Sequence, residues 1–254
     1  MQTSKYINLP RDSLFYFLSL LVLIRCFWQF QVIETLTRIG NIHFSVDSFD
    51  EALKVFEKVN ELIEQISPDD TERIGGILHS IAETYEEKGD CDKAIAKFTE
   101  SIDKLKRGCS SDHPDIAKAL QRLGDIAGGD GELEMAIEYY SEALRIRRMG
   151  FDAKLEAESL HCLGVMTRRQ GEAQLAKHFL EDALEIRRKH PDISGRDTAE
   201  TLLDIGNCCR VLFEPKDAIR LFEQALEVLP EGDEFFGTVY LAIGHVKLFF
   251  RAIF

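Results

Sequence analysis

Residues 112–147 read DHPDIAKALQRLGDIAGGDGELEMAIEYYSEALRIR, and the spacing of the apolar residues in this segment predicts its structure. Its apolar side chains recur every three or four residues in two runs separated by GGDG, the pattern of two amphipathic helices joined by a turn. The opening Asp112-His113-Pro114 supplies a cap followed by a proline in the first helical turn, where the missing amide hydrogen costs nothing. The stretch therefore predicts an antiparallel helix pair.

The landmarks of this pair recur along the chain at spacings of 42, 42, 40, 42 and 38 residues. Each unit contains a small residue that follows an apolar one: Gly40, Ala82, Gly124, Gly164, Gly206 and Gly244. Twelve residues later comes an alanine: Ala52, Ala94, Ala136, Ala176 and Ala218. Four residues further stands a large side chain: Phe56, Phe98, Tyr140, Leu180 and Phe222. One pair cannot bury its apolar face alone, so stacking of the pairs must supply the core.

This spacing of Gly or Ala, Ala, then Phe or Tyr resembles the tetratricopeptide repeat, and the period of 42 residues is similar to the kinesin light chain subtype. The resemblance implies an all-α fold, a right-handed superhelical α-solenoid of stacked antiparallel helix pairs preceded by an apolar N-terminal helix. We expect residues 1–31 to form the apolar N-terminal segment, and residues 32–254 to hold five repeats and one terminal helix. The aromatic residue usual at the eleventh position survives only as Tyr85.

The composition speaks against several function classes. With 44 Asp and Glu against 31 Lys and Arg, the net charge of −13 disfavours nucleic acid as a partner. No CxxC or HxxxH pair is present, no Gly-x-Ser-x-Gly occurs, and the glycine-rich 128–131 lacks the Lys-Ser/Thr of a phosphate-binding loop. We therefore expect no catalytic activity, no metal site and no cofactor.

The resemblance implies that the first helix of each repeat lines a concave groove, which is where we look for a binding site. Counting the Gly or Ala as position eight, the family's groove positions are 2, 5, 6, 9, 12 and 13. In the first two repeats these positions hold one cation and four acids, a net charge of −3, and in the next three they hold five cations and four acids, a net charge of +1. Arginine and lysine suit carboxylates, which favours a short acidic or C-terminal peptide as the ligand. The candidate groove residues are Asn41, Lys118, Arg122, Arg168, Arg169, Asn207 and Arg210.

Within this set, Arg168, Arg169 and Arg210 are expected to form one patch on neighbouring helices. A narrower resemblance exists to tetratricopeptide clamps for the C-terminal carboxylate of heat-shock chaperones. Asn41, Lys118 and Arg122 match that pattern, whereas Thr37 and Ser80 do not, so one charge and one amide of the clamp are missing.

Both ends of the chain are apolar. Sixteen of the twenty residues in 14–33 are apolar, and three interpretations stay open: a helix packed over the first repeat, an uncleaved membrane anchor or signal, and an imperfect start of the reading frame. Arg25 near the middle of this run would make insertion into a membrane costly. At the other end, residues 248–254 read LFFRAIF, where repeat arrays normally place a polar cap, so self-association through this end is an alternative.

The six cysteines show no spacing that predicts disulfides, which favours a reduced, cytoplasmic repeat domain even if the N-terminal segment contacts a membrane. We therefore expect a non-catalytic scaffold or adaptor that binds a protein or peptide partner. The alternative is a self-assembly or membrane-tethered assembly module that uses the apolar ends. Light scattering would separate the two hypotheses. Trimming the chain to begin near Val32 would abolish self-association or membrane binding only if the chain is an assembly module.

Overall fold

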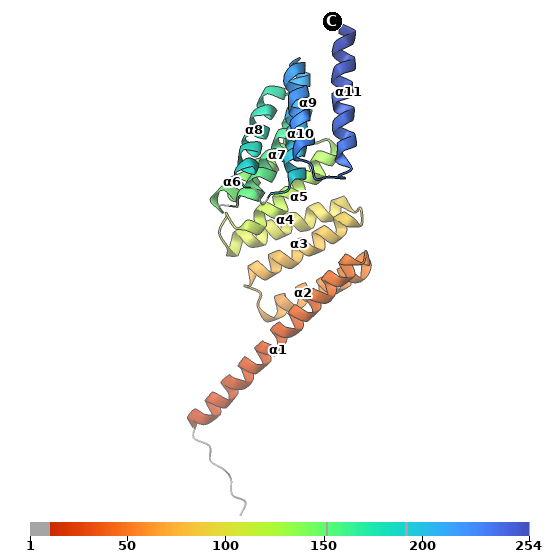
Figure 1. Ribbon diagram of the computed structural model, residues 1–254. Helices are drawn as coiled ribbons and strands as arrows, with labels where there is room; N and C mark the ends of the chain where they lie inside the picture. The colour runs from red at the N-terminus through yellow and green to blue at the C-terminus, as the bar shows by residue number, and fades with distance from the viewer. Residues whose placement is uncertain (1–10, 151, 191–192, 254) are drawn as a thin grey trace, which may run out of the picture. The chain divides into compact units, whose positions relative to one another are not determined.

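The computed structural model describes residues 11–150, 152–190 and 193–253, and over these residues the chain is all-α, without strands (Figure 1). The residues group into two compact units that divide between Lys104 and Leu105. The helices of unit 1 are α1 (Arg11–Ser45), α2 (Phe49–Ile66), α3 (Thr71–Glu87) and α4 (Cys91–Gly108), the last of which contains the division. Those of unit 2 are α5 (Pro114–Asp130), α6 (Leu133–Met149), α7 (Ala153–Gln170), α8 (Ala173–Lys189), α9 (Gly195–Val211), α10 (Pro215–Val228) and α11 (Phe235–Ile253).

The fold class predicted from the repeat is confirmed, because the helices follow one another as stacked antiparallel pairs. Local sequence explains where they begin and end. His113 caps α5, its ring nitrogen accepting from the Asp115 amide at 3.3 Å, and Pro114 is the first helical residue. The turns after α5 and α7 use Gly131 and Gly171 with φ of 86° and 104°, a backbone conformation that favours glycine.

In unit 1, α1 is one continuous helix that includes both the apolar N-terminal stretch and the first helix of the first repeat. The expected boundary between residues 31 and 32 therefore falls inside a helix. From Trp28 onward, where its side chains are described, α1 packs through Phe30, Ile33 and Leu36 against α2 and α3. No helix in the described part of the chain is long and apolar enough to cross a membrane.

In unit 2, each repeat closes by packing the large side chain of its second helix onto the glycine of its first. A Cβ added to Gly124 would lie 2.7 Å from the Tyr140 ring, and one added to Gly164 would lie 2.6 Å from Leu180. Gly206 meets the Phe222 ring in the same way. These rings and side chains are buried, so the small residue predicted from sequence is a requirement of close helix approach.

Two buried arginines join consecutive repeats of unit 2. Arg147 on α6 donates to Ser159 Oγ at 2.7 Å and to the Leu155 carbonyl at 3.0 Å, both on α7. Arg187 on α8 makes the corresponding bonds to Thr201 Oγ1 and the Asp197 carbonyl on α9. Burial lowers the pKa of both guanidinium groups, but they stay charged because their usual pKa is far above neutrality.

The buried thiols provide a test of packing in unit 2. Cys91, Cys162 and Cys208 are free thiols, and burial raises the pKa of Cys162 to about 11 and of Cys208 to about 12. Since the thiolate is the reactive form, both should alkylate slowly at pH 8, whereas Cys91 is exposed. We expect iodoacetamide to modify Cys91 at least about tenfold faster than Cys162 or Cys208, as followed by peptide mass spectrometry.

Labelling in urea is the control for this experiment, because unfolding should make the three cysteines react at similar rates. Equal rates in the native chain would contradict the described burial. Raising the pH toward 11 should accelerate Cys162 relative to its rate at pH 8, since the thiolate fraction rises as the pH approaches the raised pKa.

Candidate functional site

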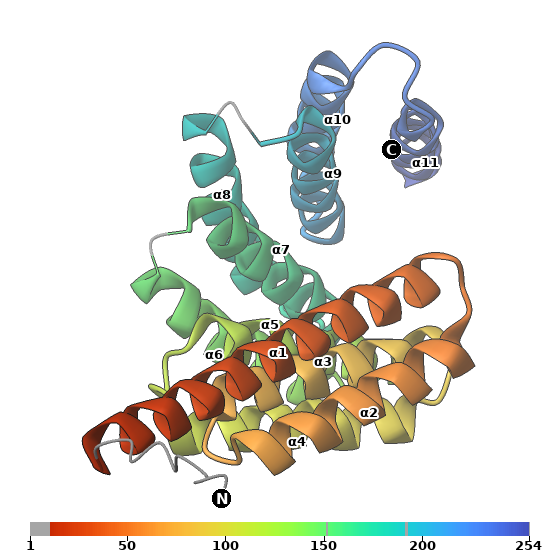
Figure 2. The ribbon, with the colours of Figure 1, turned by 90° about the horizontal axis from the view of Figure 1, so that it is seen from below.

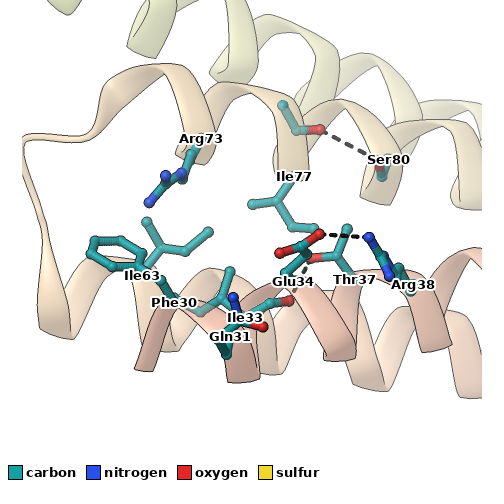
Figure 3. A pocket seen from close by; sticks show the side chains of 11 residues that line it. Phe30, Gln31, Ile33, Glu34, Thr37, Arg38, Ile63, Arg73, Ile77 and Ser80 are labelled. Carbon is teal, nitrogen blue, oxygen red and sulfur yellow. Dashed lines mark hydrogen bonds and ion pairs between the residues drawn. The ribbon is translucent and has the colours of Figure 1, made fainter. Parts of the chain in front are cut away.

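Unit 1 contains a groove between α1 and α3, with a cavity of about 480 Å³ (Figure 3). Its apolar lining comes from Phe30, Ile33, Ile63 and Ile77. Its polar lining comes from Gln31, Glu34, Thr37, Arg38, Arg73 and Ser80. Glu34, Thr37 and Ser80 of this lining occupy groove positions that the repeat numbering predicts. The walls of the groove are therefore the first helices of two successive repeats, α1 and α3.

The cations of this groove already have partners. Arg38 pairs with Glu34 at 2.7 Å within α1, and Arg73 lies over the Phe30 ring at 4.5 Å from its centroid while it contacts Asp70 at 3.3 Å. Asn41 is exposed three residues after Arg38 and lies outside the cavity lining. The unit 1 groove therefore offers an apolar surface with internally balanced charge.

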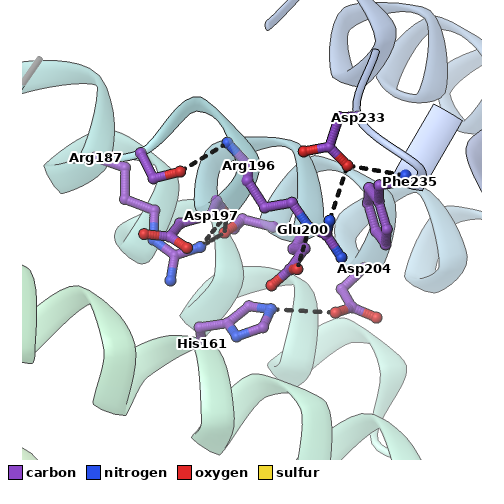
Figure 4. A network of polar contacts seen from close by, with 10 residues as sticks. His161, Arg187, Arg196, Asp197, Glu200, Asp204, Asp233 and Phe235 are labelled. Atoms are coloured by element: carbon purple, nitrogen blue, oxygen red, sulfur yellow. Dashed lines mark hydrogen bonds and ion pairs between the residues drawn. The ribbon is translucent and has the colours of Figure 1, made fainter. Parts of the chain in front are cut away.

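In unit 2, the Asp204 carboxylate on α9 contacts two side chains of α7. Arg168 Nη2 donates to Asp204 Oδ1 at 3.2 Å, and His161 Nε2 lies 3.1 Å from Oδ2 (Figure 4). All three side chains are largely buried, with exposed fractions of 17–23%. The charge of Arg168 is therefore compensated inside the protein.

The other candidate cations near α5 and α7 are also placed by local contacts. Arg169 donates to the Gly128 carbonyl on α5 at 2.7 Å, which ties α7 to α5. Lys118 is exposed and pairs with Asp115 at 2.6 Å, one turn earlier on the same helix. Arg122 is half-buried one turn after Lys118, so these two candidates do share one face of α5.

A second cavity, of about 310 Å³, lies between α9 and α11. Leu203, Leu241 and Ala242 form its apolar part, and its polar groups are Asn207, Arg210, Thr238 and His245. Within the described residues, the exposed Arg210 guanidinium has neither an ion pair nor a hydrogen bond. The cavity thus combines an uncompensated cation with an amide and an imidazole beside an apolar wall, an arrangement that suits a carboxylate carried on an apolar segment.

The wall supplied by α11 is fixed by a polar network at the start of α9 (Figure 4). Arg196 contacts Glu200 at 3.1 Å and Asp233 at 2.8 Å, and its guanidinium lies 4.8 Å from the centroid of the Phe235 ring. Asp233 also accepts from the Phe235 amide at 2.9 Å, where α11 begins. These contacts hold the first turn of α11 against α9 and so set the width of the cavity.

The structure thus separates the arginines that the sequence grouped together. Arg168 reaches forward to α9, Arg169 reaches back to α5, and Arg210 faces α11. Asn207 and Arg210, both candidate groove residues, line one cavity. Sequence reasoning missed Thr238, Leu241 and His245, although continuing the position count from Gly244 would have placed them at positions 2, 5 and 9.

The described residues contain no group of three or more His, Cys, Asp or Glu side chains placed to hold a metal ion. The polar groups of the α9–α11 cavity can donate hydrogen bonds and attract anions. The arrangement therefore supports recognition by charge and hydrogen bonding.

A family model described as "Tetratricopeptide repeat" matches residues 31–107, 73–149 and 155–231. Over 109 residues, or 43% of this chain, the sequence is 28% identical to "Heat shock protein STI1" of Saccharomyces cerevisiae. The matched region is 17% of that protein, so the chain corresponds to a small part of it.

Solved structures show the same fold at low sequence identity. BtubC (BKLC) from P. vanneervenii superposes with a TM-score of 0.72 at 19% identity, covering 78% of this chain and 80% of that chain. The kinesin light chain TPR-like repeats of Podosopora anserina superpose with a TM-score of 0.64 at 16% identity. The superposition covers 77% of this chain and 94% of that chain. The similarity to kinesin light chain repeats predicted from the period is therefore confirmed at the level of the fold.

Proposed function

This chain belongs to the tetratricopeptide repeat family, and we propose that it is a non-catalytic scaffold that binds a short acidic or C-terminal peptide segment of a partner protein. Proteins of this family are generally interaction modules, and nothing in the described residues shows catalysis. We place the chain in the cytoplasm, a proposal supported by the free thiols of Cys91, Cys162, Cys208 and Cys209.

The observation that carries the proposal is the cavity between α9 and α11. Arg210 is the cation there without an internal partner among the described residues, and Asn207 lies one turn before it on α9. A peptide carboxylate at Arg210 would gain a charge-assisted hydrogen bond, while the Asn207 amide would bond to the peptide backbone. Apolar side chains of the same peptide would contact Leu203 and Leu241.

The remaining candidate residues contribute to the proposed binding in different ways. Lys118 and Arg122 on α5 extend the positive surface of unit 2, whereas Arg168 and Arg169 contribute mainly by holding neighbouring helices in place. Asn41 belongs to unit 1 and lies outside the cavity lining there, so it has no part in the proposed site of unit 2. We therefore assign the preference for acidic peptides chiefly to Arg210.

The test is a titration of an eight-residue fluorescein-labelled peptide of alternating Asp and Leu with the full chain, followed by fluorescence anisotropy. Arg210→Ala should weaken binding about tenfold or more, because a hydrogen bond to a charged group contributes about 1.5–3 kcal/mol. The amidated form of the peptide distinguishes recognition of the terminal carboxylate from recognition of the Asp side chains.

Arg220→Ala is the matched control, since Arg220 is an exposed arginine on α10 that pairs with Asp217 at 3.0 Å. It removes the same charge from unit 2 outside the cavity and should change the affinity less than about twofold. An Arg210→Ala variant that binds the peptide as tightly as the unmodified chain would overturn the proposal.

A further inference from the structure

The repeat register relates the α9–α11 cavity to the ion pairs between α7 and α9. The helices α7, α9 and α11 are the first helices of three successive repeats, and α9 lies between the other two (Figure 2). A residue of α7 has its equivalent on α9 42 residues later, and a residue of α9 has its equivalent on α11 38 residues later. Contacts between α7 and α9 can therefore be compared, position by position, with those between α9 and α11.

Three residues form the polar contacts between α7 and α9 that matter here. His161 at position five and Arg168 at position twelve of α7 both contact the Asp204 carboxylate at position six of α9, at 3.1 and 3.2 Å. The guanidinium lies at one carboxylate oxygen and the imidazole at the other. A single carboxylate between the two helices thus compensates the charge of Arg168.

The equivalents of these three residues are Leu203, Arg210 and Ala242, and all three line the α9–α11 cavity. The arginine at position twelve is kept, since Arg210 corresponds to Arg168. The acid at position six is replaced, because Ala242 stands where Asp204 stands one repeat earlier. The cavity of about 310 Å³ therefore lies where the register places a carboxylate in the preceding repeat, and Arg210 lacks the partner that Arg168 has.

The rest of the lining suits a carboxylate from outside the chain. No Asp or Glu is among the described residues that line the cavity, so nothing there repels an anion. Asn207, Thr238 and His245 can each donate a hydrogen bond to the second carboxylate oxygen. Leu203 takes the place of the imidazole and leaves one side of the position apolar.

We propose that a carboxylate of the bound peptide occupies, beside Ala242 and against Arg210, the position that the Asp204 carboxylate occupies one repeat earlier. Ala242 is then the residue that makes this cavity selective for acidic peptides, because its side chain ends at Cβ and leaves Arg210 without an internal acid. The inference rests on the proposed function and adds the place of the carboxylate. An Asp side chain and a peptide terminus carry the same group, and the free and amidated forms of the peptide distinguish the two sources.

Ala242→Asp tests this position without any peptide. The introduced carboxyl should lie against Arg210 as Asp204 lies against Arg168, and an opposite charge at this distance lowers the pKa of a carboxyl. We expect it to titrate at least about one pH unit lower than the same carboxyl in the double variant that also contains Arg210→Ala. Carbon-13 NMR of the aspartate-labelled chain measures both titrations, and the spectrum of the unmodified chain identifies the additional resonance.

Ala242→Asp should also weaken binding of the labelled Asp-Leu peptide about tenfold or more, because Arg210 then has an internal partner. Thr238→Asp is the matched control, since it adds the same charge to the same cavity one turn earlier on α11. Position two already carries Glu158 and Glu200 in the preceding repeats. The control should weaken the peptide less than about threefold at physiological salt, which screens exposed charges.

A second variant leaves Ala242 unchanged and so guards against a folding defect there. Asp204→Ala would empty the same position one repeat earlier, beside Arg168 and His161. In the Arg210→Ala chain it should therefore recover at least about threefold of the lost affinity, with Arg168 as the new cation for the peptide.

The inference alone is overturned if the unmodified chain binds the peptide but the introduced carboxyl titrates at the same pH with and without Arg210. It is also overturned if Ala242→Asp and Thr238→Asp weaken the peptide equally, or if Asp204→Ala recovers no affinity in the Arg210→Ala chain. Failure of the unmodified chain to bind the peptide would overturn the proposed function, and the inference with it.

Discussion

Gly206→Leu is expected to lower the free energy of unfolding of unit 2 by about 3 kcal/mol, the upper part of the usual range for overpacking a core. The Phe222 ring occupies the space beside Gly206 and is fully buried, so neither the new side chain nor the ring has room to move outward. The measurement is urea unfolding followed by circular dichroism at 222 nm.

The matched control for this substitution is Gly244→Leu. It makes the same chemical change at the same repeat position, where an added Cβ would meet nothing within 4 Å. Since leucine favours a helix over glycine, we expect stability to stay the same or rise by up to about 1 kcal/mol. Equal losses at the two glycines would contradict the proposed packing. Removing the ring with Phe222→Ala should recover part of the loss in the Gly206→Leu background, whereas in the Gly244→Leu background it should only lower the stability.

Arg147→Met is the second change with a large expected effect, a loss of about 2–4 kcal/mol in the free energy of unfolding. The Arg147 guanidinium is buried and donates to Gln121 Oε1 at 3.0 Å as well as to Ser159 and Leu155. Methionine keeps much of the apolar volume of the arginine stem, so the loss reports mainly on polar groups left without a donor.

Arg148→Ala is the control for Arg147→Met. Arg148 is the next residue, is largely exposed and pairs with Glu156 at 2.9 Å on the surface. Its removal should cost no more than about 0.5–1 kcal/mol. If the two variants lost equal stability in urea unfolding, Arg147 would not join α6 to α7 in the way the structure describes.

Much of the fold could be predicted because its determinants are local and periodic. The offset of sixteen residues between Gly206 and Phe222 follows from two helices and a short turn, and the structure places these residues in contact. The same reasoning located the proline at the start of α5. It did not predict that α1 is one continuous helix. The repeat register shows where the first repeat lies, but it does not show whether the apolar stretch before it belongs to the same helix.

The candidate site was less predictable because its charges are compensated over long sequence distances. Arg168 looked like a free cation, but its partner Asp204 is 36 residues away. Arg169 likewise donates to a backbone carbonyl 41 residues earlier. Such partners depend on the exact stacking of the helices, whereas the count of groove positions gives only the face on which a residue lies. Asn207 and Arg210 shared a cavity because they lie one turn apart on one helix.

Site-specific crosslinking is a direct test of whether the cavity between α9 and α11 binds an acidic peptide. Thr238 lines the cavity and is exposed, so it can be replaced by photoreactive benzoylphenylalanine and irradiated with the labelled Asp-Leu peptide. We expect a covalent adduct at position 238 that is lost in the Arg210→Ala background. No adduct at position 238, or an equal yield with the photoreactive residue at the exposed Glu223 of α10, would contradict it.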